Sequence, residues 1–117
     1  MAKDFKTLVR MRKWALDEKQ RELGEMLAVL DNLVGEKEAL EKAVLAEQKV
    51  AAENPELAGF AYGGFAHAVI AAREAISKLI AEQEEKIGVF CYEVDDAFQG
   101  MKRAKIAERN RANGVLA

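Results

Sequence analysis

Apolar side chains recur along this chain at alternating steps of four and three residues, on both sides of its single proline. Such a repeat places its members on one stripe of a helix, the seam against which a second helix packs. In the first half, the two seam positions hold Val9, Leu16, Leu23, Leu30, Lys37, Val44 and Ala51, and Phe5, Arg12, Lys19, Met26, Leu33, Leu40 and Glu47. In the second half, they hold Tyr62, Val69, Ile76, Gln83, Phe90, Ala97 and Ala104, and Ala66, Arg73, Ile80, Ile87, Val94 and Met101. Two amphipathic helices are therefore expected.

The break between the two stripes predicts how the helices cover each other. The residue before a proline avoids helical backbone, so the first helix should end close to Asn54-Pro55. We predict helices over about 4–52 and 61–112, joined by a turn over about 53–60, although Asn54 as a cap and Pro55 as a first helical residue also suit an earlier start. The expected fold is all-α, a long antiparallel two-helix coiled-coil hairpin that forms one domain over 1–117. A dimer through one long parallel coil is the competing arrangement, and Asn113-Gly114 is a plausible helix stop.

Cysteine usage and hydropathy bear on the compartment. Cys91 is the only cysteine and has no partner for an internal disulfide, which favours a reducing environment. The first residues carry charges every few positions and do not resemble a secretory signal. No apolar run approaches the roughly 18 residues of a membrane span. The sequence thus predicts a soluble cytoplasmic protein.

Charge is distributed unevenly beneath a formal net charge of −2. Residues 1–21 carry seven Lys and Arg against three Asp and Glu, and residues 101–117 carry five against one, so each end has a formal charge of +4. Residues 22–100 then carry −10. An antiparallel hairpin would place the two basic ends side by side and form a basic tip suited to an acidic partner surface. Our candidates for this tip are Arg10, Arg12, Lys13, Lys102, Arg103 and Lys105.

Residues with catalytic or ligand-binding chemistry are few. The only histidine, His67, lies among alanines, and metal sites need several ligands. Asp95 and Asp96 are consecutive, so on a helix their carboxylates diverge by about 100° and are better explained as two solvated groups. There is no phosphate-binding glycine loop of the GxxxxGK[ST] type. We therefore expect no enzyme activity, cofactor, metal or small-molecule substrate, and the sparse aromatics among the basic residues argue against a nucleic-acid partner.

Aromatic side chains raise two further alternatives. Phe60, Tyr62 and Phe65 cluster near the expected turn, where they either plug the turn or form an exposed patch for a partner. Trp14 falls outside the seam positions. It either covers the edge of the seam or anchors a partner, as tryptophan often does at interfaces.

The order of segments in this chain resembles a known family. The segments are "RMRKW" followed by "DEKQRELGEM", then "FAYGGF" at the start of the second half, "AISKL" heptads and a basic tail "MKRAKIAERNR". Together they resemble the central stalk protein of the flagellar type III export apparatus, the FliJ-type family. The resemblance spans most of the chain.

This resemblance implies a fold, two partners and a location. The expected fold is an antiparallel two-helix coiled coil similar to the paired terminal helices of the rotary ATP synthase gamma subunit. The paired termini of such a stalk sit in the pore of a hexameric export ATPase. The middle and far parts of the hairpin reach the cytoplasmic domain of the export gate, which couples the two for export of flagellar subunits. The location would be cytoplasmic, at the flagellar basal body, and some members bind export chaperones.

The resemblance also suggests gate-contact positions. Aligned on "ELGEM" and on the Tyr-x-x-Phe of the second half, these positions are Glu36, Leu40, Ala43 and Glu47, and Phe65, Val69, Ala72 and Ile76. Leu40, Phe65 and Ala72 keep the family's residue type, whereas Ala43 and Glu47 replace aromatic residues. A coiled-coil chaperone or adaptor, or the equivalent stalk of an injectisome, is the alternative function, since the same fold serves both.

Overall fold

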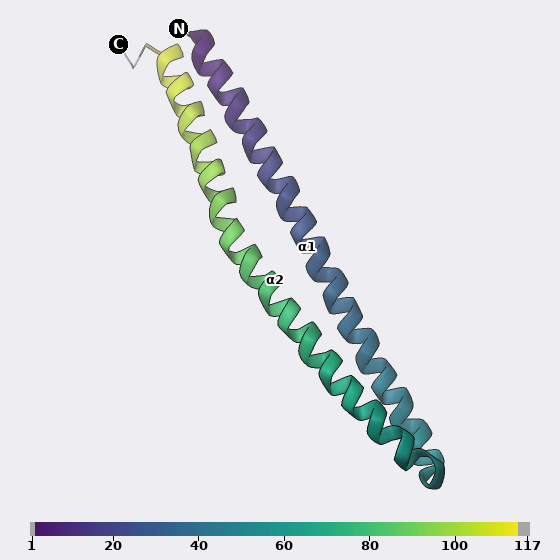
Figure 1. Cartoon of the computed structure of the whole chain (residues 1–117). Helices are drawn as coiled ribbons and strands as arrows, with labels where there is room; N and C mark the ends of the chain where they lie inside the picture. The colour runs from purple at the N-terminus through teal and green to yellow at the C-terminus, as the bar shows by residue number, and fades with distance from the viewer. Residues whose placement is uncertain (1, 115–117) are drawn as a thin grey trace. The chain divides into compact units, whose positions relative to one another are not determined.

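The computed structural model describes residues 2–114, and side chains are described for 4–55 and 63–114. Two helices account for almost all of this range: α1 spans Ala2–Glu53 and α2 spans Pro55–Ala112 (Figure 1). They run in opposite directions and pack against each other, so the chain is an all-α antiparallel two-helix hairpin, as predicted.

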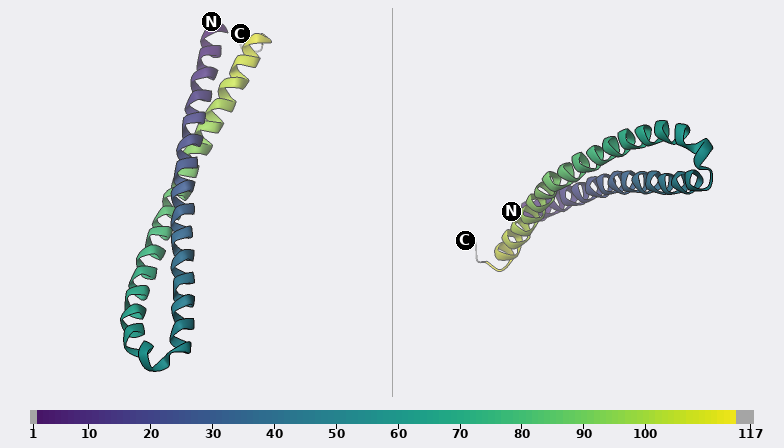
Figure 2. Two further views of the ribbon diagram at one scale, coloured as in Figure 1. Left: turned by 90° about the vertical axis from the view of Figure 1, so that its right-hand side faces the viewer. Right: turned by 90° about the horizontal axis from the view of Figure 1, so that it is seen from below.

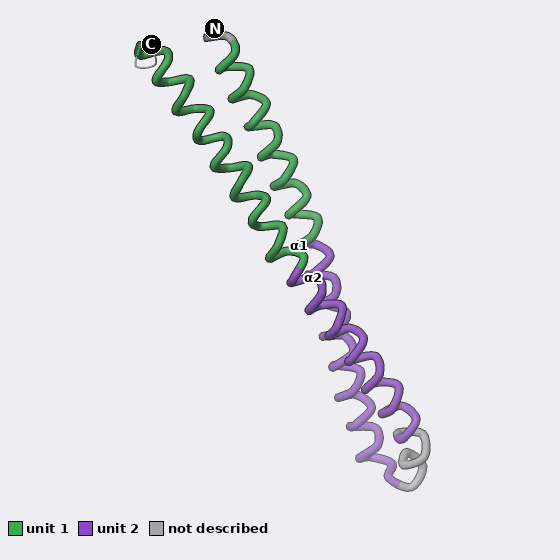
Figure 3. The backbone as a smooth tube through the Cα atoms, turned by 60° about the vertical axis from the view of Figure 1, so that its left-hand side comes forward, with its two compact units in different colours: residues 1–27, 86–117 green, residues 28–85 purple. Residues whose placement is uncertain are grey.

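Contacts divide the chain into two compact units, and each helix contributes one segment to each unit (Figure 3). Unit 1 comprises Met1–Leu27 of the α1 side and Lys86–Ala117 of the α2 side, and unit 2 comprises Ala28–Glu85. Within unit 1, the beginning of α1 and the end of α2 lie side by side at the same end of the unit (Figure 2). Each unit is therefore a pair of antiparallel helical segments.

The predicted seam is confirmed by the burial of its members. Every seam position with a described side chain is buried or half-buried, except for the three charged residues Arg12, Glu47 and Arg73. Tyr62, the first seam residue of the second half, lies outside the described side chains. Among the described side chains, five apolar ones are buried to 9% exposure or less: Leu16, Val69, Phe90, Met101 and Ala104. Most seam residues are only half-buried because a two-helix pair has no third element to cover them.

The turn is shorter than the predicted one over about 53–60, because α2 begins at Pro55 and leaves only Asn54 between the helices. Proline suits the first helical position, since its missing N–H would have no partner there. The Asn54 N–H donates to the Val50 carbonyl oxygen at 3.1 Å and closes the last turn of α1. Gly63 and Gly64 consequently lie inside α2, and a Cβ at either would meet nothing within 4 Å.

The predicted stop at Asn113-Gly114 is confirmed. The last α-helical residue is Ala112, and the N–H of Gly114 donates to the Arg111 carbonyl oxygen at 3.1 Å. Gly114 has a φ of 74°, in the left-handed region that glycine enters without a steric penalty. Neither helix, over the residues described, has a stretch long and apolar enough to cross a membrane.

Candidate protein-binding surfaces

Three contacts between α1 and α2 set the register of unit 1. The Arg111 guanidinium carbon lies 5.7 Å from the centre of the Phe5 ring. The Arg12 side chain lies over Gly100, where a Cβ would be 3.7 Å from the Arg12 Nη1. The first turns of α1 therefore lie opposite the last turns of α2, and the two basic ends of the sequence come together as the predicted antiparallel hairpin implies.

The third contact combines an ion pair with a ring. Lys19 Nζ lies 3.2 Å from Glu93 Oε1 and 5.3 Å from the centre of the Phe90 ring. From the sequence, Lys19 was only a basic residue at a seam position. Glu93 lies 74 residues from Lys19 in the sequence. Only the register of the two helices could therefore reveal this contact.

All six candidate residues of the basic tip, Arg10, Arg12, Lys13, Lys102, Arg103 and Lys105, are exposed and belong to unit 1. Lys102 Nζ lies 5.5 Å from the centre of the Phe98 ring, one turn earlier on α2. Unit 1 as a whole carries 13 Lys and Arg against nine Asp and Glu, a formal charge of +4. Unit 2 carries five against 11, a formal charge of −6. The uneven distribution of charge along the sequence thus corresponds to a difference in charge between the two packed units.

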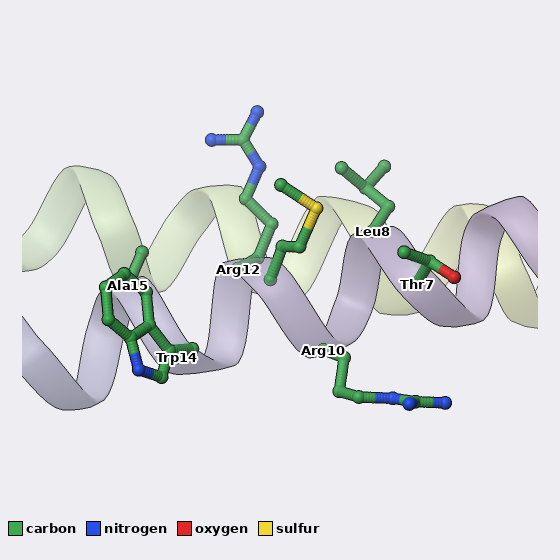
Figure 4. A pocket seen from close by; sticks show the side chains of 7 residues that line it. Thr7, Leu8, Arg10, Arg12, Trp14 and Ala15 are labelled. Atoms are coloured by element: carbon green, nitrogen blue, oxygen red, sulfur yellow. The ribbon is translucent and has the colours of Figure 1, made fainter.

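An apolar strip on α1 was not predicted as a surface. Met11 is 63% exposed and Trp14 67% exposed, and with Leu8 and Ala15 they form what we call the outer strip. These residues, together with Thr7, Arg10 and Arg12, line an open hollow (Figure 4). Trp14 is too exposed to cover much of the seam, and its interpretation as a partner anchor stays a prediction.

The eight positions suggested for gate contact all belong to unit 2 but differ in exposure. Val69 is buried at 7%, and Leu40, Phe65 and Ile76 are half-buried. The exposed positions are Glu36, Ala43, Glu47 and Ala72. These four are fully open to contact, whereas the half-buried positions keep only part of their side chains accessible. Which of the eight positions contact a partner stays a prediction. Of the aromatic cluster, Phe60 and Tyr62 lie outside the described side chains.

Among the described side chains of unit 2, one ion pair joins the two helices. Arg73 Nη2 lies 3.7 Å from Glu41 Oε1, with both side chains about half exposed. Exposed pairs of this kind contribute little to stability because both charges remain solvated. Arg73, predicted as a seam residue, therefore lies at the edge of the seam and contacts Glu41 there.

Among the side chains that the structure describes, no group of three or more His, Cys, Asp or Glu residues is arranged to hold a metal ion. Arg21 donates to Glu18 at 3.0 Å and to Glu25 at 2.6 Å. The hydrogen bond from Arg21 and the charges of both carboxylates hold the pKa of the guanidinium above its ordinary value, so it stays charged at any physiological pH. These ion pairs run along the surface of α1 from Glu18 to Glu25.

The features available for interpreting function are therefore the basic tip, the outer strip and the exposed positions of unit 2. No protein-family model, curated protein or solved structure matches this chain.

Proposed function

We propose that the chain is a non-enzymatic central stalk of the flagellar type III export apparatus. In this role unit 1 binds the hexameric export ATPase through the basic tip, and unit 2 binds the cytoplasmic domain of the export gate. The observation that carries the proposal is the pairing of both basic ends in one unit, with Arg111 over Phe5 and Arg12 over Gly100. The stalk works in the cytoplasm at the flagellar basal body, where it couples the ATPase to the gate during export of flagellar subunits.

The basic tip has the size and charge for insertion into a ring. Two α-helices side by side measure on the order of 20 Å across, which is narrow enough for the central pore of a hexamer. Its six exposed cations would be attracted to carboxylates that line such a pore, and long-range attraction also orients the approach. Because the charges lie on two rigid helices, their spacing is held when the partner binds.

Unit 2 has a different surface, which favours a different partner. Its formal charge of −6 argues against competition with unit 1 for an acidic socket. Glu36, Ala43, Glu47 and Ala72 are the exposed members of the suggested gate-contact set, and we assign the direct contact to them. Export chaperones are further partners under this proposal.

The test is a binding measurement with the purified chain, the cognate export ATPase and the gate's cytoplasmic domain. Reversing Lys102, Arg103 and Lys105 to Glu should remove ATPase binding and leave gate binding intact. The matched control reverses Lys42, Lys49 and Lys78, which are also exposed but lie in unit 2. Glu36→Lys with Glu47→Lys should weaken gate binding alone. If the unmodified chain binds neither protein, the stalk assignment is wrong.

A genetic test separates the two related systems. Deletion of the gene should abolish flagellar filaments and swimming, and the unmodified chain should restore both. Loss of effector secretion with normal motility would assign the chain to an injectisome instead.

A further inference from the structure

The outer strip is a second apolar stripe that the hairpin does not use. The apolar seam residues Phe5, Val9 and Leu16 face α2, whereas Met11 lies two residues after Val9 and Trp14 two residues before Leu16. At about 100° per residue on a helix, this offset carries a side chain well away from the seam. Figure 4 looks onto this face, with the ribbon of α2 behind α1. The exposed fractions of 63% for Met11 and 67% for Trp14 show that neither helix covers them.

The relief of this face suits a second helix. Side chains four residues apart form ridges, here Thr7–Met11–Ala15, Arg10–Trp14 and Leu8–Arg12, and the open hollow lies among them. Helices pack by placing the ridges of one in the grooves of the other. A crossing helix would therefore seat an apolar side chain between Met11 and Trp14. The hollow spans about two turns, or roughly 12 Å, which is the contact length of two helices that cross at an angle.

The charged residues around the outer strip favour some binding partners over others. Arg10 and Lys13 lie along one margin and Arg12 along the other, all of them exposed. A partner helix with Asp or Glu along its margins would be complementary to these cations, whereas basic margins would be repelled. The strip of a second copy would bring like charges together. An anionic membrane is disfavoured because Asp4 and Glu18, each seven residues from Met11, place carboxylates at both ends of the strip.

We propose that the outer strip docks one amphipathic helix of a partner protein, with apolar residues against Met11 and Trp14 and carboxylates opposite Arg10, Arg12 and Lys13. The inference rests on the proposed function only for the identity of the partner, since that function assigns this end of unit 1 to the export ATPase. The chemistry of the docked helix follows from unit 1 alone. The outer strip would thus add an apolar anchor to the contact between unit 1 and the export ATPase, which the basic tip explains by charge alone.

Trp14 is the chain's only tryptophan, so its fluorescence reports on the strip itself. The probes are two synthetic helical peptides with the same Leu and Ile face, one with Glu along both margins and the other with Lys. The acidic peptide should give a saturable blue shift of Trp14 emission, because docking removes the indole from water. The basic peptide and vesicles of anionic lipid should give none. Absence of a shift with the acidic peptide, equal shifts with both peptides, or a shift with vesicles alone would overturn the proposal.

Two variants test which side chains carry the docking. Met11→Glu should weaken the binding of the acidic peptide at least about tenfold, as expected for an anchor residue. Val89→Glu is the matched control, because Val89 is 61% exposed, lies on α2 of the same unit and gains the same charge. Arg10→Glu with Lys13→Glu should reverse the preference between the two peptides. Equal losses for Met11→Glu and Val89→Glu would count against the strip as the docking site.

The same measurement with the export ATPase keeps the two proposals separate. If the acidic peptide docks but the ATPase does not bind the chain, the strip stands and the stalk assignment fails. If the ATPase binds while Trp14 emission is unchanged and the acidic peptide does not dock, the stalk assignment stands and the strip proposal fails.

Discussion

The two units of this hairpin are built from the same heptad repeat, yet they bury their seams to different depths. Among the described side chains, unit 1 holds four of the five buried apolar residues, Leu16, Phe90, Met101 and Ala104. In the described part of unit 2, Val69 is the only one. An apolar repeat alone is therefore insufficient to enclose a side chain in a two-helix pair, and the neighbours across the seam matter as much.

The charged seam positions account for part of the difference. In unit 1, Arg12 lies over Gly100 and Lys19 lies over the Phe90 ring, so each long side chain covers part of the opposite helix. Lys and Arg can do this because their stems are apolar while their charged ends stay in water. In unit 2, Glu47 is exposed and Arg73 reaches Glu41 only at 3.7 Å. We therefore expect unit 1 to be the more stable of the two.

The largest expected effect comes from removing the ring at the centre of unit 1. Phe90→Ala should lower the free energy of unfolding by about 3 kcal/mol, because it leaves a cavity and removes the face that Lys19 covers. Chemical denaturation followed by circular dichroism measures the loss. Hydrogen exchange should show weaker amide protection in unit 1 first. Val89→Ala, at an exposed neighbour, should change stability by less than about 0.5 kcal/mol. A similar loss of stability in both variants would show that the buried ring of Phe90 does not specifically stabilise unit 1.

Replacing the glycine pair of unit 2 should reduce the difference in stability between the two units. Gly63→Ala with Gly64→Ala should raise stability by about 1–2 kcal/mol, since alanine favours the helix and a Cβ meets nothing within 4 Å at either position. A thermal melt should show the increase. Gly114→Ala is the contrasting control, because a φ of 74° penalises a side chain and stability should fall by about 1 kcal/mol. A melting temperature lowered by the double variant would mean that the pair is needed as a bend.

Val69→Ala shortens the one apolar side chain that is buried among those described in unit 2. The loss should be about 1–1.5 kcal/mol, from two methyl groups at 7% exposure. Hydrogen exchange should then show weaker protection in unit 2, opposite to the result for Phe90→Ala. Ile70→Ala, at a residue 55% exposed, serves as the control for changes in helix propensity. Equal losses of protection in both units would show that they unfold together.

The smallest effect concerns the ion pairs between the helices. A double-mutant cycle on Lys19 and Glu93, 3.2 Å apart, should give a coupling of about 0.5 kcal/mol. The cycle on Arg73 and Glu41, 3.7 Å apart, should give less. High salt should reduce both couplings, because all four side chains are partly exposed. A stronger coupling between Arg73 and Glu41 than between Lys19 and Glu93 would contradict the expectation that the ion pair of unit 1 contributes more.

Much of the fold could be predicted because helix periodicity is a local property. The seam, the antiparallel pairing and the stop at Asn113-Gly114 all follow from spacing and backbone preference. The turn was predicted too long, since Asn54-Pro55 is compatible with both an early and a late start of the second helix. Of the candidate surfaces, the basic tip followed from charge, while the outer strip was missed because Met11 and Trp14 do not look like a stripe beside the stronger seam.

By itself, the sequence determined which face of each helix is apolar and where the helices stop, because both depend on residues within a few turns of one another. Only the tertiary structure decided that Lys19 meets Phe90 and Glu93, and that Arg12 meets Gly100. Such pairs depend on the register of the two helices, which a heptad repeat leaves open to shifts of a whole repeat. The connection through Asn54 limits that register, and side-chain packing selects it. The same packing decided that burial is deepest in the unit that joins the two basic ends.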